Sequence, residues 1–318
     1  MAKVLVIGAV GQIGTELTMA LRKKHGNENV VATTRKSEFP KFMLDSGPCE
    51  KWDVTDKKAI EKSVKENKID TIYQLASLLS ATGEKNPDLA FDINLLGLKN
   101  TLDVAKECNV QKIFWPSSIA AFGPTTPRVK TPQDTVLAPT TMYGVTKVSG
   151  ELLCQYYINK YGMDIRSVRY PGLISWKAEP GGGTTDYAVA IYYEALRAKK
   201  YQCFVGENTA LPMMYMDDAI RGTIALMDAP RGSLTVKTSY NFAAISFTAK
   251  ELAEEVSRLV PGFTCTYVPD ARQKIADSWP QSIDDSVARR DWNWRHEFDL
   301  HKMSVEMIRN LKEKLGVN

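Results

Sequence analysis

Two polar side chains that can move a proton, Tyr143 and Lys147, stand four residues apart in a Y-x-x-x-K pattern. Residues four apart share one face of a helix, so this spacing places both groups together at the start of a helix that we predict over 143–161. A tyrosine with its ordinary pKa of about 10 is a poor base at neutral pH, but a neighbouring ammonium group favours the phenolate. The pair therefore indicates a general base. The alternative is a core aromatic beside a surface charge.

A reacting oxygen also needs a hydrogen-bonding partner at the end of a strand. Ser117 and Ser118 follow a strand predicted over 112–116. Ligands of open α/β sheets bind at such carboxyl ends of strands. We expect Ser118 to be the residue that binds the reacting oxygen.

Three glycines near the N-terminus have the spacing of a phosphate-binding turn. Gly8, Gly11 and Gly14 form G-x-x-G-x-x-G between a strand predicted over 3–8 and a helix predicted over 12–24. Glycine allows the sharp bend, the approach of backbone to a pyrophosphate and close packing of the helix. A bound dinucleotide is therefore favoured over a plain glycine-bearing loop, and a nicotinamide cation would further favour the Tyr143 phenolate.

The adenosine ribose is usually held by an acidic residue about 20 residues past the last glycine. Here Thr34 takes that place, followed by Arg35 and Lys36. Thr34 can bond a ribose hydroxyl, whereas Arg35 can pair with a 2′-phosphate, which favours NADP. Arg35 and Lys36 can equally be solvated loop charges. Asp53 and Val54 are candidates for holding the adenine ring, although Asp53 can also be purely structural.

The elements that position these groups follow a repeating order in the first half of the chain. Short apolar strands are predicted at 3–8, 29–34, 49–54, 71–75, 112–116 and 165–170, and amphipathic helices at 12–24, 57–67, 89–108 and 143–161. Continuous apolar strands in β-α repeats predict an α/β fold, a Rossmann doubly wound parallel sheet with helices on both faces. We expect residues 1–172 to form this dinucleotide-binding domain, with returns near 213–243.

After Pro171 this rhythm ends, and residues 173–318 are expected to form a smaller C-terminal substrate-binding lobe. Gly181 to Gly183 form a hinge-like loop. Helices are predicted over 187–198, from 216 onward and over 248–259, the last with a capping box between Thr248 and Glu251. A strand is predicted at 240–242.

The composition is that of a globular enzyme, with 44% hydrophobic and 25% charged residues among 318 and a net charge of +4. So small a positive excess does not indicate a nucleic-acid partner. No apolar run has the length of a membrane span or a signal peptide, so we expect a cytoplasmic protein without a membrane partner. The five cysteines and three histidines show no metal-binding spacing, and no metal is expected.

The residues described above resemble those of the extended short-chain dehydrogenase/reductases, over nearly the whole chain. More narrowly, five blocks are similar to the short-chain L-threonine 3-dehydrogenases, which are relatives of UDP-galactose 4-epimerase. These blocks are PSSIAAFG at 116–123, YGVTK at 143–147, PGGGTTDYA at 180–188, LPMMYM at 211–216 and SWP at 278–280. Members of that family usually carry an aspartate where Thr34 stands.

The resemblance implies a reaction and a set of site residues. The family oxidises the 3-hydroxyl of L-threonine with NAD to L-2-amino-3-oxobutyrate, which continues to glycine and acetyl-CoA or decarboxylates to aminoacetone. Catalytic roles are implied for Ser118, Tyr143 and Lys147, and substrate contacts for Ser80, Ser118, Tyr143, Thr184, Thr185 and Trp279. Cofactor contacts are expected at Gly8, Gly11, Gln12, Ile13, Gly14, Thr34, Arg35, Asp53, Val54, Leu75, Ala76, Ser77, Asn94, Pro116, Tyr143, Lys147, Tyr170, Gly172 and Ile174.

The hypothesis is therefore an NAD-dependent dehydrogenase acting on L-threonine, with NADP as the alternative cofactor. A sugar-nucleotide epimerase or dehydratase of the same extended family is the first rival. A non-enzymatic dinucleotide sensor is the second, and the presence of Tyr143 together with Lys147 counts against it. The threonine carboxylate has no obvious arginine partner; Arg169 and Arg197 are candidates, as are hydroxyls such as that of Ser80.

A homodimer is predicted from the two long helices. Both carry apolar residues on more than one face, namely Leu95, Leu96 and Leu98 on the first and Leu152, Leu153 and Tyr156 on the second. One face can cover the sheet while the other meets a partner subunit. The alternative is a helix pair that is deeply buried within one subunit.

Overall fold

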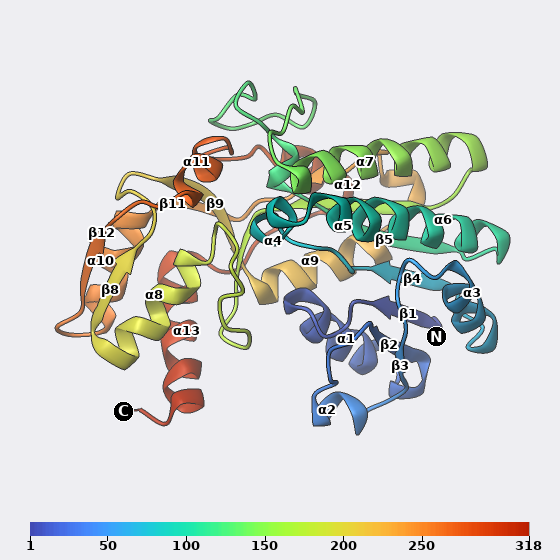
Figure 1. Ribbon diagram of the computed structural model, residues 1–318, viewed down its shortest axis with the longest axis horizontal. Helices are drawn as coiled ribbons and strands as arrows, with labels where there is room; N and C mark the ends of the chain where they lie inside the picture. Colours follow the sequence, from blue (N-terminus) through green and yellow to red (C-terminus); the bar gives the residue numbers. More distant parts are fainter. Residues whose placement is uncertain (318) are drawn as a thin grey trace. The chain divides into compact units, whose positions relative to one another are not determined.

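A seven-stranded sheet is the centre of the first of two units in the chain, whose computed structural model describes residues 1–317. The strand order is β10-β6-β5-β4-β1-β2-β3 (Figure 1), and the β1–β2, β2–β3, β1–β4 and β4–β5 pairs are parallel. The strands are β1 (Val4–Ile7), β2 (Val30–Thr34), β3 (Cys49–Lys51), β4 (Thr71–Gln74), β5 (Lys112–Ser118), β6 (Ile165–Tyr170) and β10 (Tyr240–Asn241). The predicted Rossmann fold is confirmed, and the strand order reverses at β1, where such sheets bind dinucleotides.

The core of this sheet forms because its strands are apolar along their whole length. Every residue of β1, β2 and β4 is buried, as expected for strands covered on both faces. Leu5 and Ile72 pack in one cluster with residues of α3 (Lys57–Glu66), α6 (Gly97–Glu107) and α7 (Met142–Tyr161). Helix α1 (Gln12–His25) packs against β1 and β2, with Leu17 and Leu21 fully buried. Figure 1 shows α6 and α7 running side by side along the sheet.

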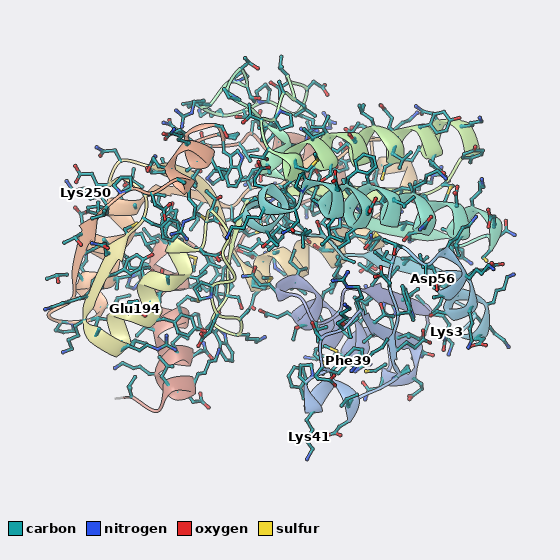
Figure 2. The ribbon with its side chains drawn as sticks, in the orientation of Figure 1. Lys3, Phe39, Lys41, Asp56, Glu194 and Lys250 are labelled. Carbon is teal, nitrogen blue, oxygen red and sulfur yellow. The ribbon has the colours of Figure 1, made fainter. Side chains whose placement is uncertain are left out.

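Two helices begin at capping residues that the sequence predicts. Asp56, which Figure 2 labels, caps α3, and its carboxylate accepts hydrogen bonds from the backbone N–H groups of Lys58 and Ala59 at 3.0 and 3.2 Å. Helix α10 (Ala249–Leu259) begins at the predicted capping box, in which Thr248 and Glu251 bond each other's backbone N–H.

Two predicted elements differ from the structure. The single helix expected over 89–108 starts earlier, as α5 (Pro87–Phe91), passes through a π-helical segment at Asp92–Leu96 and continues as α6. Such wide turns often occur at functional sites, and this one carries Asn94. The third strand ends at Lys51 rather than at 54, because Asp53 accepts a hydrogen bond from the N–H of Thr55 and turns the chain.

The second unit contains two small sheets and a layer of helices. Its strands β7 (Gly172–Ile174), β9 (Ala210–Tyr215) and β11 (Ile245–Thr248) form one sheet in the order β11-β9-β7, and β8 (Lys200–Cys203) pairs in parallel with β12 (Thr264–Tyr267). Helices α8 (Tyr187–Ala198), α10 and α13 (Leu300–Leu315) pack against one another. The centres of the Phe242 and Trp294 rings lie 4.4 Å apart in its aromatic core.

Five further α-helices lie in the described part of the chain. They are α2 (Lys41–Leu44), α4 (Ser80–Lys85), α9 (Met216–Asp228), α11 (Arg272–Asp277) and α12 (Ser286–Trp292).

The chain crosses between the two units several times. The first unit comprises Met1–Ser118, Thr141–Arg169 and Thr223–Tyr240, and the second comprises Ile119–Thr140, Tyr170–Gly222 and the chain from Asn241. Residues 119–140 thus belong to the second unit, although they lie within the range 1–172 expected for the dinucleotide-binding domain. Among residues 1–317, no helix has the length and apolarity to cross a membrane, and no three His, Cys, Asp or Glu side chains gather as metal ligands.

Candidate active site

The turn after β1 has the geometry of a phosphate-binding loop. Gly8 has a φ of +87°, a left-handed conformation, and a Cβ at this position would lie only 2.8 Å from the backbone nitrogen of Ala76. A Cβ on Gly14 would overlap the carbonyl oxygen of Gly8, so only glycine lets α1 pack this closely. Gly11 is the N-cap of α1, and no side chain among the described residues caps the helix. The first N–H groups of α1 are thus suited to an anion.

A cavity of about 200 Å³ opens beside this turn. It brings together seven predicted cofactor residues: Gly8, Thr34, Arg35, Asp53, Val54, Ala76 and Ser77. It is also lined by Ile7, Thr33, Trp52, Leu78 and Ile93, which the sequence did not point to. The Thr33 hydroxyl is buried without a hydrogen-bond partner among residues 1–317. This hydroxyl, the glycine turn and the charged rim fit the adenosine half of a dinucleotide.

Two opposite charges stand at the rim of this cavity. Arg35 Nη1 lies 3.6 Å from Asp53 Oδ2, and Asp53 Oδ1 accepts hydrogen bonds from the backbone N–H and the hydroxyl of Thr55 at 2.9 and 2.8 Å. Partial burial raises the pKa of Asp53, but the Thr55 hydrogen bonds and the Arg35 charge outweigh it, so the net pKa is lowered. Asp53 is therefore an anion at neutral pH.

Asn94 forms hydrogen bonds with the loop that follows β4. Its Oδ1 accepts hydrogen bonds from Ser77 Oγ and the N–H of Leu78, at 3.1 and 2.7 Å. Its Nδ2 donates to the carbonyl of Leu78 and to Thr146 Oγ1, both at 3.1 Å. These four bonds use the whole hydrogen-bonding capacity of the amide. Asn94 therefore joins the loop after β4 to α7.

The three predicted catalytic residues come together in the first unit. Ser118 ends β5, while Tyr143 and Lys147 lie on the first turns of α7, which Thr141 caps by accepting the N–H of Gly144 at 3.1 Å. The side chains of Tyr143 and Ser118 are hydrogen-bonded. Lys147 Nζ donates to the carbonyl of Pro116 at 2.7 Å and lies 5.2 Å from the centre of the Tyr143 ring.

The electrostatics of Tyr143 correct one expectation. Burial raises the pKa of Tyr143 to about 12, against the smaller opposing effect of the Ser118 hydrogen bond. Burial also lowers the pKa of Lys147 to about 7, with the negative charge of Glu151 opposing it. Burial of the two groups thus outweighs the predicted lowering of the tyrosine pKa by the Lys147 ammonium, whose Nζ lies 5.2 Å from the centre of the ring. The chain's own groups thus keep Tyr143 a neutral phenol.

A buried ion pair beneath these residues was missed from the sequence. Arg169 holds Glu151 with two bonds, Nε to Oε1 at 2.9 Å and Nη2 to Oε2 at 2.8 Å, and Ser117 Oγ donates to Oε1 at 2.6 Å. Glu151 follows Lys147 by one helical turn. That spacing was the only feature of the sequence that could have indicated a carboxylate near Lys147. Arg169 is therefore committed to Glu151 rather than open to a substrate carboxylate. Arg197, the other candidate, pairs with Glu179 at 3.0 Å.

Ser80 is the predicted substrate residue in the first unit. It begins α4 and is buried. Helix α4 packs against α7, where Glu84 Oε1 accepts the N–H of Met142 at 2.6 Å. Ser80 is thus on a helix that is tied to the one carrying Tyr143.

Six of the predicted residues belong to the second unit, whereas Gln12, Ile13, Leu75 and Pro116 belong to the first. Tyr170 ends β6, and Gly172 and Ile174 begin and end β7. Thr184 is 1% exposed, and its hydroxyl has no partner among the described residues. Thr185 packs against Gly172, where a Cβ would come within 2.9 Å of the threonine Cβ. Trp279 is buried, and its carbonyl accepts a hydrogen bond from Arg128.

The glycine loop before these threonines is tied to α8. Gly182 has a φ of +94°, and the N–H groups of Gly182 and Gly183 both donate to Asp186 Oδ2, at 2.7 and 2.8 Å. The loop is therefore shaped by the carboxylate that precedes α8.

Comparison with known proteins identifies the family. The model of the NAD dependent epimerase/dehydratase family matches residues 4–243. The chain belongs to this family. The resemblance to extended short-chain dehydrogenase/reductases is thereby confirmed, and a nicotinamide dinucleotide is the cofactor that membership implies.

Relatives match the chain from end to end. A protein of Staphylococcus haemolyticus named an uncharacterized epimerase/dehydratase is 48% identical over 99% of both chains. The L-threonine dehydrogenase of Clostridium difficile is 49% identical, with a TM-score of 0.97, over 100% of this chain and 99% of that one. A monomeric L-threonine 3-dehydrogenase from a metagenome is 52% identical, with a TM-score of 0.94, over 98% of this chain and 99% of that one.

Proposed function

We propose that the protein oxidises the 3-hydroxyl of L-threonine with NAD, or with NADP as the alternative cofactor, giving L-2-amino-3-oxobutyrate. The observation that carries this proposal is the meeting of Ser118, Tyr143 and Lys147 in the unit that also holds the dinucleotide cavity. The names of the two solved relatives, each about half identical to this chain, support threonine as the substrate.

In the proposed reaction, the threonine 3-hydroxyl lies between Ser118 Oγ and Tyr143 Oη. The Tyr143 phenolate accepts the hydroxyl proton, the C3–H bond breaks with its electron pair leaving as hydride, and a C3=O bond forms. Ser118 donates a hydrogen bond to the reacting oxygen. A positive charge on Lys147, 5.2 Å from the centre of the Tyr143 ring, favours the phenolate but is too weak by itself to outweigh burial. When bound, the oxidised nicotinamide supplies the hydride acceptor and a positive charge that brings down the high pKa of Tyr143.

The cofactor residues follow from the first unit and from the family resemblance. Gly11, Gln12, Ile13 and Gly14 offer the start of α1 to the pyrophosphate, and the cavity beside them takes the adenosine. In this proposal five further residues contact the rest of the cofactor. They are Leu75, which follows β4, Pro116 within β5, and Tyr170, Gly172 and Ile174.

Substrate contacts are proposed for Ser80, Thr184, Thr185 and Trp279. The support for Thr184 is its buried hydroxyl, because such a group without a partner among residues 1–317 retains its full capacity for a polar ligand. The support for the other three is the family resemblance.

The direct test is the formation of NADH from NAD, or of NADPH from NADP, by the purified protein on addition of L-threonine. We expect an increase in absorbance at the NADH band with L-threonine and none with L-valine, which has no 3-hydroxyl. A protein that binds NAD or NADP but reduces neither over a range of threonine concentrations would contradict the proposal.

A sugar-nucleotide epimerase or dehydratase is the second candidate, and the family description and the name of the staphylococcal relative favour it. Such an enzyme returns its hydride to the substrate, so no net NADH forms. Conversion of a UDP-sugar without NADH release, with no reaction of threonine, would establish this candidate in place of the first.

We also propose that the protein forms a homodimer. The side of α7 that faces away from the sheet exposes Leu152 and Tyr156, while Leu96 is exposed in the neighbouring π-helical segment and Leu98 is buried. The two helices thus have one apolar face in the core and one at the surface. Light scattering that gives the mass of one chain at micromolar concentration would contradict the dimer.

A further inference from the structure

We infer that the adenosine end of the cavity binds a dinucleotide with a 2′-phosphate more tightly than one without it, with Arg35 as the phosphate-binding residue and Asp53 as the group that opposes it. This inference deepens the proposed function, because it rests on the dinucleotide site described there. It does not rest on threonine as the substrate.

The first argument is the absence of negative charge at the end of β2. Thr34 occupies the position where an acidic residue usually bonds the ribose hydroxyls. Its carbonyl accepts the N–H of Trp52 at 3.0 Å, and its side chain lines the cavity as a neutral hydroxyl. A carboxylate at this position would repel a 2′-phosphate, whereas the hydroxyl does not.

The second argument is the state of Arg35. Its side chain is 43% exposed, and its contact with Asp53, at 3.6 Å, is longer than a hydrogen bond. Loose, half-exposed pairs of this kind contribute little to stability. The guanidinium has five N–H donors and forms its strongest bonds, often two at once, with phosphate and carboxylate oxygens. Arg35 can therefore turn to a phosphate at small cost.

The third argument concerns the surrounding charges. Glu38, the next carboxylate along the chain, is paired with Lys51 at 2.6 Å, and Lys36 is exposed beside Arg35. Asp53 keeps its own negative charge because Thr55 and Arg35 stabilise it. Two positive charges, on Arg35 and Lys36, thus attract a phosphate at the rim, and one negative charge, on Asp53, repels it. This balance favours an added phosphate and predicts that Asp53 weakens its binding.

The test is titration calorimetry with two fragments, 5′-AMP and adenosine 2′,5′-bisphosphate, in the absence of any substrate. We expect the bisphosphate to bind roughly tenfold more tightly than 5′-AMP. Arg35→Gln should remove the difference, and Thr34→Asp should reverse it. Asp53→Asn, which keeps an oxygen for the Thr55 hydrogen bonds, should enlarge it.

The matched control is Lys62→Gln, which removes an exposed positive charge on α3, outside the residues that line the cavity, and should leave the ratio unchanged. Thermal unfolding of each variant shows whether it is folded. Equal binding of the two fragments by the unaltered protein, or tighter binding of 5′-AMP, would overturn the inference and leave the proposed function intact. If neither fragment binds, the dinucleotide site itself fails, and the proposed function fails with it.

Discussion

The charged side chains at the two ends of the seven-stranded sheet differ in how deeply they are buried and in how closely they are paired. Around Lys147 the charged groups are buried, and Glu151 accepts hydrogen bonds from Arg169 at 2.8 and 2.9 Å and from Ser117 at 2.6 Å. At the cavity rim, Arg35 and Asp53 are more than a third exposed and stand 3.6 Å apart. Proton transfer needs groups whose pKa values are displaced by burial, whereas selection between cofactors needs charges that can exchange partners. The buried end should therefore respond strongly to substitution and the rim only weakly.

The largest expected effect is on turnover at the buried end. Tyr143→Phe removes the oxygen that accepts the proton and should lower kcat for threonine oxidation by about 10²- to 10⁴-fold. The ring remains, so the melting temperature should change little. Turnover and thermal unfolding measured on the same preparation check both expectations. Near-normal turnover in the variant would remove Tyr143 from the mechanism.

The next largest effect is on stability. Glu151→Gln leaves the buried Arg169 guanidinium without a negative partner, and loss of one member of such a pair costs about 3–5 kcal/mol. Unfolding by urea measures this change. Asp53→Asn at the rim is the matched comparison, and a similar loss in both variants would show that the two ends do not differ as argued.

A pair of neighbouring serines separates catalysis from stability. Ser118→Ala removes the hydrogen bond to Tyr143 and should lower kcat roughly 10- to 100-fold, with unfolding almost unchanged. Ser117→Ala removes the bond to Glu151 and should lower the free energy of unfolding by about 1–3 kcal/mol, with kcat nearly retained. Kinetics and urea unfolding of both variants decide the assignment, and the reverse pattern would assign catalysis to Ser117.

The pH dependence of stability probes Lys147. Burial lowers its pKa to about 7 in the folded chain, while the unfolded chain keeps the ordinary value of about 10.5. Between these values the unfolded state binds one more proton, so the contribution of Lys147 to stability rises with pH by about 1.4 kcal/mol per unit. Relative to Lys147→Met, the unaltered protein should gain stability from pH 7 to pH 9. The exposed Lys62→Met is the control, and a flat difference for Lys147 would contradict the shifted pKa.

The smallest effect is expected at the cavity rim. A double-mutant cycle on Arg35→Gln and Asp53→Asn should give a coupling free energy below about 1 kcal/mol, because the pair is half exposed and loosely spaced. The same two variants should nevertheless change nucleotide preference, as described above. A coupling of several kcal/mol would show that Arg35 is committed to Asp53 and is not open to a phosphate.

Elements whose signals are local were predictable from the sequence. The apolar run of β1, the glycine spacing at 8, 11 and 14, the capping box of α10 and the four-residue step from Tyr143 to Lys147 all depend on neighbours within a few positions. Hydrophobic periodicity and turn chemistry act over that range, so they can be read without a fold.

Features that need distant partners were not predictable. The contacts of Asn94 are one example, because its amide bonds Ser77, Leu78 and Thr146, the last 52 positions away. The pairing of Glu151 with Arg169 and the raised pKa of Tyr143 depend on burial that periodicity does not report. The crossing of 119–140 into the second unit is likewise a property of packing.

From the amino-acid sequence alone came the fold class, the glycine turn after the first strand and the side chains that we propose for proton transfer, because residue type and short-range spacing suffice for these. Folding in three dimensions decided which serine faces Tyr143, which arginine is already paired, and how acidic the phenol is. Those properties arise from solvent exclusion and from contacts between residues far apart in the chain, and both exist only once the core has formed.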